Sequence, residues 1–365
     1  MSRIILHAGP EKCGSSSIQS AMMGGSEELK NLAYAMMLAP KDLRKLDCPQ
    51  PEPEVIAHFH SLIKNAAAAH PEKTLMLSHE MMFKMVNALV NLSKIAREHA
   101  DEVIVVAYIR RQSDFLVSSF GQWLFRSPER IVETADVLRK HKIDPTLFWG
   151  VERHLIAAVL GGWNIGRQLS GHLYLDWSES IPERVAALKP TGVPISIGLL
   201  PRTGFDIPLI SDFLTRANLD PKAGTSVESV RNPSYHPSMI EAVLNAIEAG
   251  HSMPGPHEAN EFFLQANTQI IQKVESETQL TSQLKCTIDT IFEQKNVRIA
   301  RELNLPPEYF MPKDHIDPDI MREKIFTEAA KRAAVPEELR NRERQSRAAL
   351  AQMAWLIFQR QNQHQ

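Results

Sequence analysis

Short, continuous apolar runs are the first regular feature of this chain, and they predict a buried β-sheet. The strongest run is Val103–Ile109, which is rich in β-branched side chains. Shorter runs lie at Ile4–Leu6, Thr74–Leu77, Leu173–Leu175 and Ile195–Leu200. Continuous rather than alternating apolar runs are typical of parallel strands that are covered on both faces.

The segments between these runs favour helices. A Ser-rich segment opens a helix with Ile18 and Met22 on one face, a Met-rich helical stretch starts at His79, and a further helix is predicted over Ser113–Arg126. Because strands alternate with helices, we predict an α/β protein with a mostly parallel, doubly wound sheet.

The C-terminal part of the chain is helical in character. A helix is predicted over Glu258–Leu303, ahead of Pro306-Pro307, and a last helix over Glu337–Arg360. We therefore predict an α/β domain over residues 1–310 and a helical C-terminal extension over residues 311–365. The extension could serve as a dimerisation element, as a cover for a cleft or only for packing, and a homodimer stays open as the oligomeric state.

Composition and charge narrow the function without identifying it. The chain has 365 residues and a formal net charge of -2, so no overall basic field favours nucleic acid as a partner. Cys13, Cys48 and Cys286 match neither a disulfide framework nor a zinc signature, which favours a reducing compartment. The apolar runs are far shorter than the ~20 residues that span a bilayer. We expect a soluble, cytoplasmic protein with no transmembrane segment.

The first candidate site is the segment Gly9–Ser17, which reads GPEKCGSSS. It joins a predicted strand to a predicted helix, and the N–H groups and dipole of a helix N-terminus bind anions. In nucleoside-triphosphate loops a lysine directly follows the second glycine. Here Ser15 follows Gly14, and the lysine is Lys12. The segment therefore predicts an anion loop without the usual ATP clamp. The alternative is a plain turn that binds nothing.

The second candidate site follows the strongest strand. Arg110 and Arg111 come directly after Ile109, and Ser118 lies eight residues beyond Arg110. Ligands of open α/β sheets bind beyond the carboxyl ends of the strands, and arginine binds phosphate through two parallel hydrogen bonds. The alternative is that Arg110 pairs with a carboxylate such as Asp101 or Asp114.

The two segments together resemble a known enzyme family. HAGPEKCGSSSIQ and VIVVAYIRRQSDFLVSSFGQWL are similar to the nucleotide signatures of sulfotransferases that use 3′-phosphoadenosine 5′-phosphosulfate (PAPS), most of all the bacterial branch related to carbohydrate sulfotransferases. Weaker similarity continues at Leu209–Leu214, Arg231–Tyr235 and Ile291–Asn304. The resemblance implies a P-loop-like, three-layer fold with PAPS as the co-substrate and no metal.

The resemblance also assigns roles to individual residues. It places the 5′-phosphosulfate on Lys12, Cys13, Gly14, Ser15, Ser16 and Ser17, and the 3′-phosphate on Arg110 and Ser118. Lys12 is expected to stabilise the charge that develops as the sulfuryl group leaves. Cys13 stands where the family has Thr or Ser, and a thiol is a poorer hydrogen-bond donor.

The candidates for the base that deprotonates the acceptor hydroxyl follow the strand predicted at residues 74–77. Related carbohydrate sulfotransferases use a glutamate and the small-molecule branch uses a histidine, and here Glu80 and His79 are adjacent. Only one of them is expected to face the sulfuryl group, because neighbouring helical side chains point ~100° apart. The alternative is that Ser78 caps a helix and Glu80 only favours its first turn.

Other polar residues have weaker interpretations. Gln122 and Trp123 are candidate acceptor contacts, although a tryptophan at helical spacing is more often a core residue. His58 and His60 suggest a metal pair, but without a nearby Cys or acidic cluster a surface helix is favoured. Acceptor selectivity is expected in loops such as Ser127–Trp149.

The predicted function is therefore transfer of a sulfuryl group to a hydroxyl of a glycan, glycolipid or small metabolite. One alternative is a nucleotide kinase or NTPase on a degenerate P-loop, for which a lysine in place of Ser15 would be expected. The other is a non-catalytic nucleotide-binding scaffold.

Overall fold

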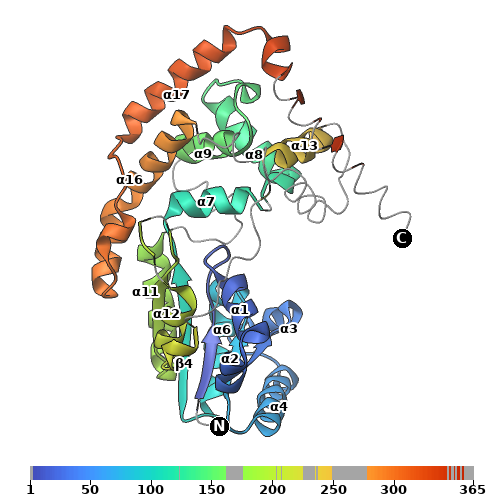
Figure 1. Cartoon of the computed structure of the whole chain (residues 1–365), viewed down its shortest axis with the longest axis vertical. Coiled ribbons are helices and arrows are strands. Elements are labelled where there is room, and N and C mark those ends of the chain that lie inside the picture. Colours follow the sequence, from blue (N-terminus) through green and yellow to red (C-terminus); the bar gives the residue numbers. More distant parts are fainter. Residues whose placement is uncertain are drawn as a thin grey trace. The chain divides into compact units, whose positions relative to one another are not determined.

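The computed structural model describes residues 3–122, 124–161, 176–202, 204–206, 208–224, 235, 237–248 and 278–342, together with 345–346, 349, 352–353 and 356 (Figure 1). The chain divides into two compact units. The first unit comprises residues 1–111, 172–232 and 295–310, and the second comprises residues 112–171, 233–294 and 311–365. The predicted boundary after residue 310 is one of the points at which the chain changes unit.

A five-stranded, all-parallel sheet forms the centre of the first unit, with the order β2-β3-β1-β4-β5. The strands are β1 (Arg3–His7), β2 (Ala33–Met37), β3 (Thr74–Ser78), β4 (Glu102–Ile109) and β5 (Ile195–Leu199). Four predicted strands and the α/β class are thereby confirmed. The sequence pattern misses β2 because its sequence, AYAMM, contains no β-branched residue. The run Leu173–Leu175 lies outside the described residues.

Helices cover both faces of this sheet, as in a three-layer α/β fold. Ile4 and Leu6 of β1 belong to a core cluster that includes residues of α3, α4 and α6. Side chains alternate along a strand, so His7 lies on the opposite face, where its ring meets Phe213 of α12 edge-on at 5.5 Å. The helical elements of this unit are α1 (Ser15–Gly24), α2 (Glu27–Leu32), α3 (Pro40–Leu46), α4 (Pro53–Ala69), α5 (Met81–Lys84), α6 (Val86–Arg97), α11 (Trp177–Leu188), η3 (Lys189–Thr191), α12 (Leu209–Arg216), η4 (Pro221–Gly224) and η5 (Pro307–Phe310).

The strand order places β1 and β4, the strands that precede the two predicted anion segments, side by side. From β1 the chain continues to β2 on one side of the sheet, and from β4 it continues to β5 on the other side. The carboxyl ends of β1 and β4 therefore adjoin at the point where the order reverses, which is where open α/β sheets bind ligands. His7, the last residue of β1, lies in register with Ser78 of β3 and Val106 of β4.

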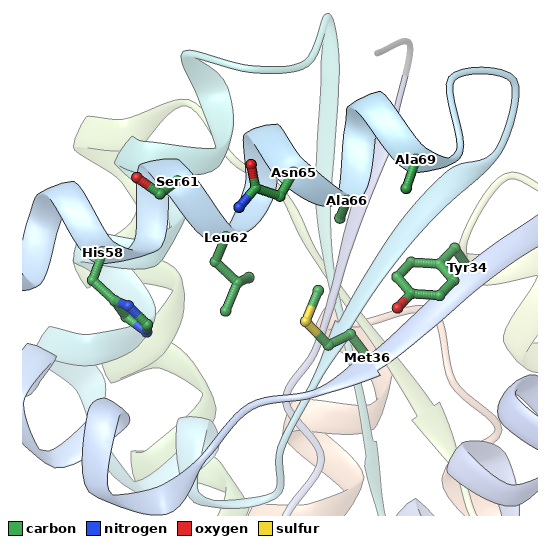
Figure 2. Close-up of a pocket in the computed structure, with 8 residues that line it drawn as sticks. All are labelled: Tyr34, Met36, His58, Ser61, Leu62, Asn65, Ala66 and Ala69. Carbon is green, nitrogen blue, oxygen red and sulfur yellow. The ribbon is translucent and has the colours of Figure 1, made fainter.

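A separate pocket of about 440 Å³ lies at the edge of the sheet, between β2 and α4 (Figure 2). Tyr34 and Met36 line it from the strand, and Leu62 and Ala66 line it from the helix. Because β3 separates β2 from β1, this pocket belongs to a different part of the sheet from the loop that follows β1.

The described part of the second unit is helical. Its core cluster includes Phe120, Phe125, Tyr235, Met239 and Val243. Its helical elements are α7 (Gln112–Phe120), η1 (Leu124–Arg126), α8 (Pro128–Lys140), η2 (Pro145–Leu147), α9 (Gly150–Gly161), α13 (Pro237–Glu248) and α17 (Pro318–Ala333), and α16 (Gln279–Glu302) continues from this unit into the first. No helix in the described residues is long and apolar enough to cross a membrane.

The segment Ser127–Trp149 is mostly helical, so the expectation that it is a loop is wrong. Pro128 stands at the start of α8, where the missing N–H of proline costs nothing and its φ suits a helix. Ala135 and Leu138 bury one face of this helix, which gives the segment a packing role. The helix predicted over Ser113–Arg126 ends earlier, at Phe120, and a 3-10 turn follows it.

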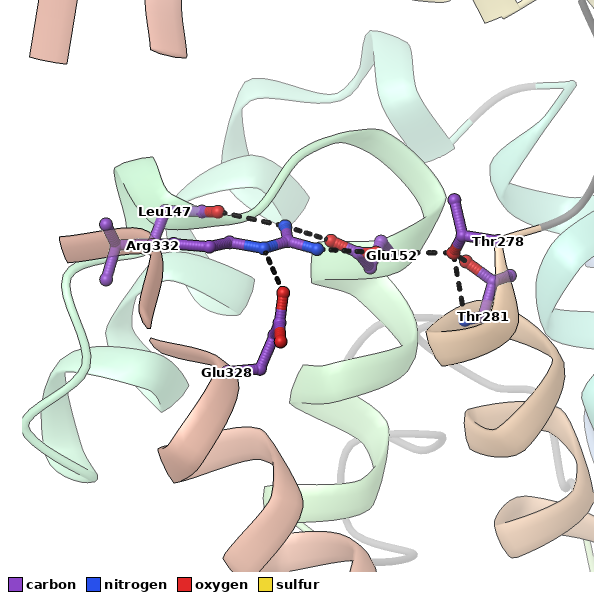
Figure 3. Close-up of polar contacts among 6 residues, drawn as sticks. All are labelled: Leu147, Glu152, Thr278, Thr281, Glu328 and Arg332. Atoms are coloured by element: carbon purple, nitrogen blue, oxygen red, sulfur yellow. Dashed lines mark hydrogen bonds and ion pairs between the residues drawn. The ribbon is translucent and has the colours of Figure 1, made fainter. Parts of the chain in front are cut away.

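Arg332, at the end of α17, holds the beginning of the C-terminal tail against α9 (Figure 3). Its Nη1 and Nη2 donate to the two carboxylate oxygens of Glu152 at 2.5 and 3.2 Å. Nη1 also donates to the carbonyl of Leu147 at 3.1 Å, and Nε donates to Glu328 at 3.0 Å. This part of the tail therefore packs on α9.

Arg332→Met is expected to lower the free energy of unfolding by about 1–3 kcal/mol, because Glu152 is only 12% exposed and would lose its bidentate partner. Methionine keeps the aliphatic contacts, so packing changes little. Urea denaturation followed by circular dichroism measures the effect. Arg322→Met is the matched control, because Arg322 on the same helix pairs with the exposed Asp319. Equal effects of the two substitutions would contradict the role given to Arg332.

Candidate functional site

The loop between β1 and α1 is shaped by two left-handed residues. Lys12 has φ 62° and Gly14, at the N-cap of α1, has φ 89°. A Cβ at Gly14 would lie 2.7 Å from Leu200 Cδ1, so the loop requires glycine here both for its backbone angle and for space. The N–H of Cys13 donates to the carbonyl of Pro10 at 3.3 Å, which closes the turn before the helix.

The first turn of α1 carries N–H groups without intrahelical acceptors. The first intrahelical bond runs from the N–H of Ile18 to the carbonyl of Gly14 at 3.1 Å, and Gly14 has no side chain with which to cap the turn. The N–H groups of Ser15, Ser16 and Ser17 therefore precede the helical ladder. Together with the helix dipole, they make this N-terminus able to bind an anion.

A buried hydroxyl strengthens this arrangement. Ser15 is 3% exposed, and its Oγ has no hydrogen-bond partner among the described residues. A Cβ at Gly9 would lie 3.1 Å from this Oγ, so the absence of a side chain at Gly9 leaves room beside it. A buried polar atom without a partner costs about 1–3 kcal/mol, and such atoms in folded proteins often mark a binding role.

Cys13 and the two following serines differ in their exposure. The side chain of Cys13 is buried, and burial raises the pKa of its thiol to about 12, so it stays protonated. Cys13 therefore packs beneath the loop. Ser16 and Ser17 are half-buried and lie on the first turn of α1.

Arg110 connects the end of β4 to the loop. Its Nη1 donates to the carbonyl of Lys12 at 3.0 Å, and its own carbonyl accepts the indole N–H of Trp177 at 2.8 Å. The structure thus brings Lys12 and Arg110 together from positions far apart in the sequence. The alternative pairing with Asp101 is wrong, since Asp101 precedes β4 and lies at its other end. Asp114 lies near Lys285, with 3.8 Å between Nζ and Oδ1.

Ser118 lies on α7 in the second unit and is half-buried. The start of this helix is held by Asp289 of α16, which accepts from the N–H of Ser113 at 3.2 Å and from its hydroxyl at 2.8 Å. Asp289 is 2% exposed. Sequence reasoning does not find Asp289, because it lies 176 residues after Ser113 in the sequence.

Glu80 lies beside the loop at the carboxyl end of β3. Lys84, four residues later, forms an ion pair of 2.6 Å with Glu11 of the loop, and both side chains are less than one-fifth exposed. Burial raises the pKa of Glu80, and the negative charge of Glu11 raises it further, whereas Lys12 and Lys84 act to lower it. Two carboxylates and two ammonium groups thus gather at this end of the sheet.

His79 is arranged differently from Glu80. It is 9% exposed, and burial lowers its pKa. Its Nδ1 accepts the backbone N–H of Met81 at 3.0 Å, so its proton belongs on Nε2. The interpretation that Ser78 caps this helix is wrong, because Ser78 ends β3 and its hydroxyl binds other partners.

Those partners of Ser78 are residues that sequence reasoning missed. The Oγ of Ser78 lies 2.8 Å from Nδ1 of His7 and accepts from Nε2 of Gln19 at 3.0 Å. His7 is 1% exposed, and burial lowers its pKa to about 3. The only sequence signal was the position of His7 between an apolar run and the loop, and the contact with Ser78 depends on the strand order.

The two histidines of α4, His58 and His60, contact different residues. His58 lies near Asp42, with 3.7 Å between Nε2 and Oδ2, while Nδ1 of His60 lies 2.8 Å from Nε2 of His99. The two therefore do not act as a pair, and the described residues contain no cluster of three or more metal-ligating side chains. Gln122 is half-buried in the second unit, and Trp123 lies outside the described residues.

Comparisons of the chain with protein-family models, with curated proteins and with solved structures found no match.

Proposed function

We propose that the chain is a sulfotransferase with a P-loop-like fold, which binds PAPS at the β1–α1 loop and transfers its sulfuryl group to a hydroxyl of a glycan, glycolipid or small metabolite. The observation that carries this proposal is the buried Ser15 hydroxyl, which has no hydrogen-bond partner among the described residues and lies at the N-terminus of α1, next to Gly9. The hydrogen bond from Arg110 to the carbonyl of Lys12 supports it, since it joins the two segments on which the resemblance rests.

In the proposed reaction the acceptor oxygen attacks sulfur while the bond from sulfur to the 5′-phosphate oxygen breaks. Glu80 takes the proton of the acceptor hydroxyl, and its raised pKa makes it a stronger base than an ordinary glutamate. Lys12 and the N–H groups of Ser15–Ser17 stabilise the negative charge that develops on the departing phosphate. His79 suits this task less well than Glu80, because its Nδ1 is already bonded to Met81.

Several features favour sulfuryl transfer over ATP chemistry. A kinase or NTPase loop has a lysine where this chain has Ser15. Such enzymes also commonly hold magnesium with an acidic residue after a central strand, whereas Arg110 follows β4. Arginine at this position suits the 3′-phosphate that distinguishes PAPS from ATP.

Calorimetric titration with adenosine 3′,5′-bisphosphate, the expected product, tests the proposal against ATP and AMP. A clear preference for the bisphosphate is expected, because it occupies both anion positions. Preference for ATP with magnesium would instead support a nucleotide kinase or NTPase. The absence of binding by all three nucleotides would contradict the proposal.

Arg110→Gln is expected to weaken the affinity for the bisphosphate about 10-fold while leaving that for AMP unchanged, because AMP lacks the 3′-phosphate. Glutamine keeps an N–H donor for the Lys12 carbonyl, so the loop loses little support. The same titrations measure the effect. Arg97→Gln, at the end of α6, is the control and should bind both nucleotides normally. Equal weakening of both nucleotides by Arg110→Gln would contradict a 3′-phosphate contact.

A further inference from the structure

A second buried polar atom without a partner lies at the same loop. Nε2 of His7 has no hydrogen-bond partner among the described residues, although the imidazole is 1% exposed. A Cβ at Gly9 would lie 3.6 Å from this nitrogen and 3.1 Å from Oγ of Ser15. Both unpartnered atoms therefore flank the same glycine. Neither the sequence motif nor the resemblance gives His7 a role.

The hydrogen bonds of Ser78 favour one of the two neutral tautomers of His7. The Ser78 hydroxyl accepts from Nε2 of Gln19 at 3.0 Å, so its own single hydrogen is available for another acceptor. We infer that Nδ1 of His7, at 2.8 Å, is that acceptor. In the neutral imidazole the proton then lies on Nε2, which makes this atom a donor that faces the loop.

The surroundings of His7 keep the ring neutral. The residues that lie against its ring include Ser78 of β3, Phe213 of α12 and Gly9 of the loop, and none of these three carries a charged side chain. Burial disfavours the imidazolium and lowers the pKa of His7 to about 3. The ring is thus a neutral donor throughout the physiological range.

We propose that His7 is a further anion-binding residue of the β1–α1 loop, and that its Nε2–H and the Ser15 hydroxyl form their missing hydrogen bonds when a tetrahedral oxyanion is bound. This inference rests on the proposed function, since it needs an anion in the loop. It adds a neutral, orientation-fixed donor to the charged groups Lys12 and Arg110. A preorganised donor needs no rearrangement when the ligand arrives, which favours binding.

Two-bond ¹H–¹⁵N spectra of the histidine-labelled full chain test the proposal directly. Between pH 5 and pH 8, His7 should show the neutral Nε2–H pattern, and its Nε2 resonance should move on addition of adenosine 3′,5′-bisphosphate or inorganic sulfate. His58 is an internal control, because it lies on α4 beside Asp42, at the pocket along β2 and not at the β1–α1 loop. Its resonance should stay unchanged.

Two variants add a binding measurement. His7→Phe keeps a ring of similar size without the donor, assigns the His7 resonance, and should weaken affinity for the bisphosphate about 10-fold. Ser78→Ala leaves His7 in place but removes the hydroxyl that holds its tautomer. It should reveal some Nδ1–H form and weaken binding by about 3-fold.

The outcomes separate this inference from the proposed function. Shifts of the Ser15–Ser17 amides on ligand addition, with an unmoved His7 Nε2, would overturn the role of His7 and leave the anion loop intact. An Nδ1–H tautomer in the unmodified protein would overturn it as well. The absence of saturable shifts in the Ser15–Ser17 amides would reject the anion site itself, and with it the role of His7.

Discussion

Lys12→Ala is expected to reduce turnover of PAPS about 10²–10³-fold and to change the affinity for adenosine 3′,5′-bisphosphate much less. The reason is that the charge that Lys12 neutralises develops mainly in the transition state, as the bond between sulfur and the 5′-phosphate oxygen breaks. The left-handed Lys12 residue, with φ 62°, places this lysine within the loop itself, where its carbonyl accepts from Arg110. Release of the bisphosphate with a simple aryl alcohol as acceptor measures turnover.

Two comparisons keep the Lys12 result interpretable. Lys30→Ala removes a lysine from α2, where Lys30 pairs with the exposed Glu27, and should leave turnover unchanged. Calorimetry on Lys12→Ala should give an affinity close to that of the unmodified protein. Equal losses of turnover and affinity would assign Lys12 to ground-state binding instead of to the transition state.

Glu80→Gln is expected to reduce turnover about 10²–10⁴-fold with nucleotide affinity preserved, because glutamine has a similar shape but cannot accept the proton of the acceptor hydroxyl. His79→Gln is the matched control, since the two residues are adjacent and both are candidates for the base. If His79→Gln abolishes turnover and Glu80→Gln does not, the base is His79.

The pH dependence of turnover gives a sharper test of Glu80. Activity should rise with pH through the pKa of Glu80, since the carboxylate is the active form. Glu11→Gln removes a neighbouring negative charge, so it should lower the pKa of Glu80 and move the rise in activity to lower pH. Lys84→Met removes a positive charge, so it should raise this pKa and move the rise to higher pH. Both variants break the same ion pair. Shifts in the same direction would therefore indicate a structural role for the pair and exclude Glu80 as the titrating base.

Much of the first unit was predictable because its strands carry a strong local signal. The run Val103–Ile109 forms β4 within one residue of its predicted start, since continuous β-branched residues can only be buried on both faces of a parallel sheet. The loop Gly9–Ser17 was found by its glycines and its position before a helix. β2 was missed because it consists mostly of Ala and Met, which have high helix propensity.

Interactions between distant segments were not predictable in this way. The ion pair between Glu11 and Lys84 joins the loop to α5, and nothing in the spacing of the two residues marks it. The same holds for Arg332 and Glu152 in the second unit. Ser127–Trp149 was expected to be a loop, but the structure contains a helix there, α8, whose Ala135 and Leu138 are buried. Local sequence patterns indicate whether a segment is a helix, a strand or a turn, but they do not indicate which distant segments it contacts.

The sequence by itself determined the α/β class, four of the strands and the glycine- and serine-containing turn with Lys12 and Ser15, because periodicity and turn chemistry act over a few neighbouring residues. Only the tertiary structure decided that Arg110 reaches the Lys12 carbonyl, and that the Ser78 hydroxyl lies 2.8 Å from Nδ1 of His7. These contacts depend on the strand order β2-β3-β1-β4-β5, which places β1 between β3 and β4. Strand order is decided by the packing of the whole sheet, so no single segment encodes it.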